Sequence, residues 1–173
     1  MRQQKRLLFL VLAILILFYA IMTAYKENKR SHITNQPIVD LVKQRFAAMN
    51  RHDTDAIAKL YADGAVIQSP NAEKDVLGPA GIRSVYRRYF LTSPDMKYSI
   101  TRIIPADSSA TVEFTFTGTM QHMEDAGAKY MLGKRYTLKS CVILEVHDQK
   151  FVRDVSYFDQ VAFLRQVGFF EQK

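Results

Sequence analysis

The spacing of apolar residues changes character along the chain. Residues 7–24 form an uncharged apolar run (LLFLVLAILILFYAIMTA). Between residues 37 and 92, apolar side chains recur three and four positions apart, which is typical of amphipathic helices. Beyond residue 97 they alternate with polar ones, which is typical of strands in an antiparallel sheet with two different faces. The spacing predicts helices over 37–51, 54–61 and 78–90, and strands over 65–67, 98–104, 110–120, 130–147 and 150–158.

The order of these elements predicts the class of fold. Helices that are segregated from a run of antiparallel strands define an α+β architecture. We therefore expect three helices packed on a curved antiparallel sheet, followed by a short helix that Asp159 caps. One concave sheet face closed by amphipathic helices encloses a cone-shaped cavity, and apolar cavities of this kind hold small molecules.

The apolar run at residues 7–24 is near the lower limit of what crosses a bilayer core. A cleavable signal peptide has a shorter apolar region and a small-x-small cleavage site, which the end of this run does not offer. We expect one transmembrane helix (residues 1–25), a juxtamembrane linker (26–36) and a folded domain (37–173). Because little polypeptide precedes the run, we expect a single-pass membrane protein with its N-terminus inside and its domain exported, periplasmic or extracytoplasmic.

Charge and cysteine content reduce the number of possible functions. Of 24 basic and 17 acidic residues, six basic and one acidic fall within residues 1–30, which leaves the rest nearly balanced. A domain without a basic stripe is not expected to bind nucleic acid. The single Cys141 excludes an intramolecular disulfide. No cofactor motif is present. We interpret His122, beside Glu124 and Asp125, as an exposed polar residue of a loop rather than a metal ligand, because no second histidine stands at ligand spacing.

Three segments resemble a known family. FAAMNRHDTDAIAKLYADGAVIQSP (Phe46–Pro70), LGPAGIRSVYRRYF (Leu77–Phe90) and KFVRDVSYFDQVAFLRQVG (Lys150–Gly168) are similar to the SnoaL-like branch of the nuclear transport factor 2-like superfamily. The resemblance implies a cone-shaped, cystatin-like fold. It does not imply one activity, because this fold hosts isomerases, polyketide cyclases and binding modules.

The activity of one related enzyme class is not expected, because two of its functional residues are replaced in this chain. Ketosteroid isomerases carry a general-base aspartate just before the proline that ends the first strand, and Ser69 stands there in this chain. Their oxyanion-hole tyrosine corresponds to Arg45. A serine hydroxyl does not ionise near neutral pH, so ketosteroid isomerase chemistry is not expected.

Polyketide cyclases of the SnoaL type use a carboxylate near the final strand as an acid/base. The resemblance makes Asp159 and Asp154 the candidate catalytic residues. Each also has a structural interpretation, Asp159 as a helix cap and Asp154 as the ion-pair partner of a Lys or Arg. The candidate ligand-binding side chains are Arg45, Met49, Ser69, Tyr86, Phe90 and Tyr157.

Three functions remain open at this point. The first is a membrane-anchored cyclase- or isomerase-type enzyme that binds a small apolar molecule. The second is a non-catalytic ligand-binding module, and the third is an interaction domain that forms a homodimer through its sheet face. A carboxylate facing the cavity would favour the enzyme, and a lining of apolar and aromatic groups would favour the binder.

Overall fold

The computed structural model describes residues 2–123 and 126–171, with the backbone alone for residues 2–13, 27–34 and 126–127. The chain divides into two units, residues 1–36 and residues 37–173.

The first unit is helical. Helix α1 (Arg2–Asn50) begins in it, and the polar stretch 26–36, expected as a linker, is helical as well. Across the described residues, no helix carries an apolar stretch long enough to cross a membrane. The transmembrane helix expected at residues 7–24 is therefore not supported by the structure. The side chains of residues 7–13 lie outside the described residues, so the anchor stays a prediction.

The C-terminal part of α1 forms one wall of the folded unit. The expectation that a helix begins at Pro37 was wrong, because Pro37 lies inside α1. A proline there removes one backbone hydrogen bond, which the remaining bonds of this long helix tolerate. The expected apolar stripe is confirmed, since its members are buried: Ile38, Leu41, Val42, Phe46 and Met49.

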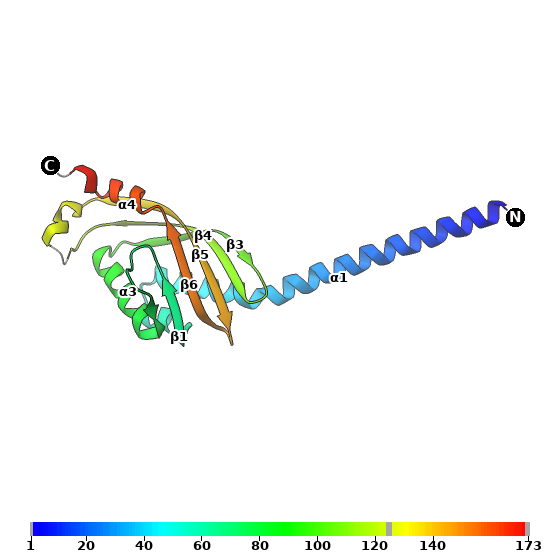
Figure 1. The fold of residues 1–173 in the computed structure, drawn as a ribbon, viewed down its shortest axis with the longest axis horizontal. Coiled ribbons are helices and arrows are strands. Elements are labelled where there is room, and N and C mark those ends of the chain that lie inside the picture. The colour runs from blue at the N-terminus through cyan, green and yellow to red at the C-terminus, as the bar shows by residue number, and fades with distance from the viewer. Residues whose placement is uncertain (1, 124–125, 172–173) are drawn as a thin grey trace. The chain divides into compact units, whose positions relative to one another are not determined.

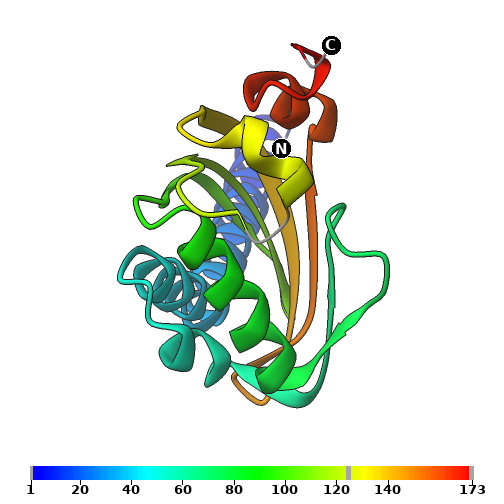
Figure 2. The same ribbon diagram turned by 90° about the vertical axis from the view of Figure 1, so that its left-hand side faces the viewer.

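Two shorter helices complete the helical layer. Helix α2 (Thr54–Ala58) is capped by Asp53, whose Oδ1 accepts a hydrogen bond of 2.9 Å from the Ala56 N–H. Helix α3 (Gly78–Thr92) begins at a glycine with φ of +60°, where a Cβ would stand 2.5 Å from the Asp63 carbonyl oxygen. Figure 2 shows both helices on the same face of the sheet.

The sheet has six strands: β1 (Tyr61–Gln68), β2 (Val76–Leu77), β3 (Lys97–Pro105), β4 (Ser109–Thr119), β5 (Arg135–His147) and β6 (Lys150–Phe158). Their order is β2-β1-β6-β5-β4-β3, which can be followed in Figure 1. The meander from β3 to β6 is antiparallel, as expected. The sheet as a whole is mixed, because β1 pairs with β6 in parallel. The prediction of an entirely antiparallel sheet was wrong because alternation along one strand carries no information about which strand lies beside it.

Short helices flank the last strands. A 3-10 helix (Ala126–Met131) occupies the start of the expected strand 130–147, so that strand begins at Arg135. Helix α4 (Gln160–Gln166) follows β6, and a 3-10 turn (Phe169–Glu171) ends the described chain.

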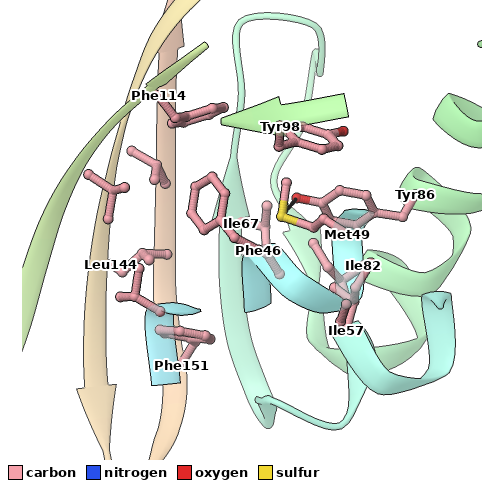
Figure 3. Packing of buried hydrophobic residues seen from close by; sticks show 14 of the residues in the cluster. Phe46, Met49, Ile57, Ile67, Ile82, Tyr86, Tyr98, Phe114, Leu144 and Phe151 are labelled. Carbon is pink, nitrogen blue, oxygen red and sulfur yellow. Dashed lines mark hydrogen bonds between the residues drawn. The ribbon is translucent and has the colours of Figure 1, made fainter. Parts of the chain in front are cut away.

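The core lies between the helices and the inner face of the sheet. Phe46 of α1 packs edge-on against Phe114 of β4, with ring centroids 5.1 Å apart. Figure 3 shows Phe46 between sheet residues on one side and Met49 with Tyr86 on the other. The alternation predicted for β4 is confirmed, because Val112 and Phe114 are buried and Glu113 is exposed. This packing leaves a cavity between the helices and the sheet.

Candidate functional site

A cavity of about 300 Å³ lies between the helices and the inner face of the sheet. Most of its wall is apolar, and the apolar side chains that line it include Met49, Phe114, Phe116, Leu138, Phe158 and Phe163. The cavity expected between the helices and the sheet is therefore present. Its size is at the lower end of the range for pockets that bury small ligands.

One polar cluster interrupts this apolar wall. The Arg45 guanidinium of α1 forms a buried ion pair with Asp154 of β6, with 2.7 Å between Nη2 and Oδ2. Arg45 also donates through Nε to the Tyr61 hydroxyl (2.8 Å) and through Nη2 to the Tyr86 hydroxyl (3.0 Å). The Tyr61 hydroxyl in turn donates to Asp154 Oδ2 at 2.6 Å. The cluster joins α1, β1, α3 and β6.

The cluster fixes the protonation of its members. The pKa of Arg45 lies well above its ordinary value: burial opposes the charge, but Tyr61, Tyr86 and Asp154 together outweigh it. Burial raises the pKa of Tyr61 and of Tyr86 above the ordinary tyrosine value, against the opposing effect of Arg45. Arg45 is therefore a permanent cation, and both tyrosines remain neutral hydrogen-bond donors.

One donor of the cluster has no acceptor. Nη1 of Arg45 is buried and has no hydrogen-bond partner among the described residues. Arg45 lines the cavity, and its Nε and Nη2 are already engaged by Tyr61, Tyr86 and Asp154. A buried donor without a partner costs free energy.

Asp154 stands behind Arg45 rather than on the cavity wall. Its side chain is 1% exposed and does not line the cavity. Oδ2 accepts from Arg45 and Tyr61, and Oδ1 accepts from the Ser156 hydroxyl at 3.3 Å. The pairing with an arginine is as expected. The catalytic role stays a prediction that this geometry does not favour.

Asp159 is the N-cap of α4. Its Oδ1 accepts a hydrogen bond of 2.9 Å from the Ala162 N–H, and the side chain is exposed and absent from the cavity wall. The capping interpretation is confirmed. No contact in the described structure connects Asp159 with the cavity, so its catalytic role also stays a prediction.

Four of the six candidate ligand-binding residues line the cavity: Arg45, Met49, Ser69 and Tyr86. The other two do not. Phe90 is buried beside the cavity, where its ring stacks on His52 with 4.1 Å between centroids. Tyr157 is 54% exposed, because it points to the opposite face of β6 from Ser156 and Phe158.

The sequence interpretation did not single out Tyr136, a lining residue on β5. A Cβ at Gly118 of β4 would stand 2.5 Å from the Tyr136 hydroxyl, so only a glycine leaves room for this ring. Burial raises the pKa of Tyr136 to about 12, against the opposing hydrogen bond with Ser93. The alternation of β5 was the signal available, because Tyr136 shares its face with Leu138 and Ser140.

No group of three metal-ligating side chains occurs among the residues that the structure describes. His122 is exposed. Glu124 and Asp125, its neighbours in the metal interpretation, lie outside the described residues.

Residues 42–154 match the family model of the SnoaL-like domain, which is more than half of the chain. The chain belongs to the SnoaL-like domain family. It lies within the nuclear transport factor 2-like superfamily, as the resemblance implied. No curated protein sequence matches the chain.

Solved structures support the same fold. A proposed polyketide cyclase from Xanthomonas campestris pv. campestris is 22% identical, with a TM-score of 0.66, 78% of this chain covered and 98% of that one. A protein of ketosteroid isomerase-like fold from Catenulispora acidiphila, in complex with trimethylamine, is 16% identical (TM-score 0.63; 74% and 92% covered). TerC, co-crystallised with polyporic acid, is 18% identical (TM-score 0.62; 76% and 98% covered). Identities this low show the fold alone.

The cap on α4 gives a first test. Asp159→Ala should lower the free energy of unfolding by about 0.5–2 kcal/mol, whereas Asp159→Asn should keep most of it, since asparagine also caps helices. Asp107→Ala, in an exposed loop, is the matched control. Chemical denaturation of the three variants measures the difference. An Asp159→Ala variant as stable as wild type would show that this cap contributes little.

Proposed function

We propose that this SnoaL-like domain binds a small, largely apolar molecule in its cavity without converting it. The observation that carries this proposal is the composition of the wall. Among the described residues, no Asp, Glu, His, Lys or Cys side chain lines the cavity. The apolar and aromatic lining is what we expect of a binder.

General acid/base catalysis needs a group whose pKa lies near the working pH. The ionisable groups on the wall are arginines and tyrosines. The pKa of Arg45 is raised, and burial raises those of Tyr86, Tyr98 and Tyr136. None of these four groups exchanges a proton readily near neutral pH, which supports binding over turnover.

A cyclase- or isomerase-type enzyme would have to use Asp154 or Asp159. Asp154 would first have to leave Arg45 and Tyr61, which would leave charge buried without a partner. Asp159 would have to leave its cap and reach the cavity. Both steps work against the catalytic alternative.

Two structural neighbours are consistent with the proposal. TerC was co-crystallised with polyporic acid, and the Catenulispora acidiphila protein was solved with trimethylamine. These are properties of those proteins. Together with the cavity of this domain, they support small-molecule binding as its function.

Filling the cavity tests the proposal. Leu138 lines the cavity and is 3% exposed, so Leu138→Trp should occupy part of the space and weaken binding of N-phenyl-1-naphthylamine, a neutral fluorescent probe, by about tenfold or more. Tyr157→Ser, on the opposite face of the sheet, should leave the affinity unchanged.

Fluorescence titration of the full chain gives both affinities, and circular dichroism confirms that each variant is folded. Equal affinity in the Leu138→Trp variant and in wild type would place the probe elsewhere and contradict the proposal.

Membrane attachment through residues 7–24 is also our proposal. The described part of this run has apolar side chains exposed all round, among them Ile14, Leu17 and Phe18, and apolar surface of this extent is stabilised by burial in lipid or protein. We further propose that the N-terminus lies inside and that the domain is exported.

Fractionation tests the anchor. The full chain should stay with membranes through alkaline carbonate extraction, whereas a Leu15→Arg/Ile16→Arg variant should be released, because arginine at the centre of a span costs about 2.5–3.5 kcal/mol. Release of the unmodified chain, or a mature N-terminus between residues 20 and 30, would contradict the proposal.

The homodimer through the sheet face stays a prediction. The face opposite the cavity carries exposed polar side chains, including Thr101, Glu113 and Lys139, with Tyr157 among them. A mixed polar and aromatic surface of this kind is compatible with contact between two copies.

A further inference from the structure

The cavity is open to solvent along one edge of α3. Most of its lining residues are buried or half-buried, and the two that are exposed are Arg88 of α3 and Asn71 of the loop between β1 and β2. Tyr89 and Thr92 lie beside Arg88 on the helix, line the cavity and are half-buried. The part of the wall that Arg88, Tyr89 and Thr92 form is called the mouth below. A ligand therefore meets an apolar interior and a hydrated, polar mouth.

Arg88 supplies the charge of the mouth. It has no ion-pair partner among the described residues, whereas Arg83, earlier on the same helix, is paired with Asp55 at 2.5 Å. The Arg88 guanidinium lies over the Tyr89 ring, with 6.0 Å between Cζ and the ring centroid, which is within the range of a cation–π contact. An aromatic residue of the cavity wall thus helps to hold this cation at the mouth.

The charge that the wall offers a ligand is positive. Arg45 and Arg88 are the only charged side chains that line the cavity in the described part of the chain. Asp154 neutralises Arg45 across 2.7 Å, so the charge of Arg88 is the one that remains without a counter-ion. It attracts an anionic group of a ligand at the mouth and repels a cationic one.

Burial decides where a charged group of the ligand can lie. An ion that moves into the apolar interior loses its water, which is costly. At the mouth a carboxylate keeps part of its water, and a guanidinium can donate two parallel hydrogen bonds to its oxygens. The apolar rest of the ligand is then buried against the wall, where its transfer from water is favourable.

We propose that the cavity takes an amphiphile, an apolar chain or ring that ends in a carboxylate, with the apolar part in the interior and the carboxylate at Arg88. This inference rests on the proposed binding function and names the class of ligand. Arg88 determines the charge of the ligand that is accepted, and the interior determines the size of its apolar part.

Three ligands that share one chain and differ in the head group test the inference: decanoate, decanol and decylammonium. Each competes with N-phenyl-1-naphthylamine for the purified full chain in one non-ionic detergent, which takes the same share of each ligand in every variant. Decanoate should bind more tightly than decylammonium. Arg88→Gln should weaken the binding of decanoate about fivefold, the upper range for an exposed ion pair, and leave that of decanol unchanged.

Arg87→Gln is the matched control. Arg87 is the preceding residue of α3, is exposed as well and does not line the cavity. The variant removes the same charge from the same helix, and it should change the affinity for decanoate by less than about twofold, because solvent screens a charge that does not contact the ligand. Leu138→Trp, which fills part of the interior, should weaken the binding of all three ligands.

Ionic strength gives a second readout. Sodium chloride screens exposed charges, so the affinity of the unmodified chain for decanoate should fall as salt is added, and its affinity for decanol should not fall. Arg88→Gln should remove most of this dependence, and Arg87→Gln should keep it. A merely structural role of Arg88 would affect decanoate and decanol alike.

The outcomes separate the inference from the proposed function. Equal affinity of the unmodified chain and Arg88→Gln for decanoate overturns the inference and leaves small-molecule binding in place. Equal binding of decylammonium and decanoate, or an equal loss in Arg87→Gln and Arg88→Gln, also overturns it. If the fluorescent probe binds in the cavity and none of the three ligands displaces it, the inference alone fails. If the probe does not bind in the cavity, the proposed function fails as well.

Discussion

The buried ion pair between Arg45 and Asp154 is the interaction on which the interior of this domain depends. It connects the first helix to the last strand, and Tyr61 and Tyr86 attach β1 and α3 to the same guanidinium. Burying two charges is costly, so such a pair is weak evidence of added stability. The pair instead favours one packing of the helices on the sheet over others, because any packing that separates the partners leaves an uncompensated charge in the core.

The same pair determines what the cavity can do chemically. Asp154 is committed to Arg45 and Tyr61, so the carboxylate that the polyketide cyclase resemblance offers as an acid/base instead orients a cation. Arg45 Nη1 is buried and has no hydrogen-bond partner among the described residues. The rest of the cavity wall is largely apolar and aromatic. Among the described residues, the side chains that line the cavity include no carboxylate, imidazole, lysine or thiol, the groups most often used for proton transfer near neutral pH.

Much of this fold could be predicted from the sequence, because short-range periodicity reports which side of an element is buried. The alternation of β4 placed Phe114 inward, and the cap position of Asp159 followed from local rules. Local rules did not predict contacts between segments that are distant in the sequence. The parallel pairing of β1 with β6 and the contact of Arg45 with Asp154, 109 residues away, have no local signature. The outward position of Tyr157 could have been predicted, because successive side chains of a strand point to opposite faces. Tyr157 lies three residues after Asp154, so the two side chains point to opposite faces of β6.

A double-mutant cycle on the ion pair tests the central claim most directly. Arg45→Met and Asp154→Leu should each lower the free energy of unfolding by about 3–5 kcal/mol, because each leaves a buried charge without its partner. The double variant should recover most of that loss, since it replaces the pair with apolar side chains of similar volume. Single variants as stable as wild type, or a double variant no more stable than the single variants, would contradict the account.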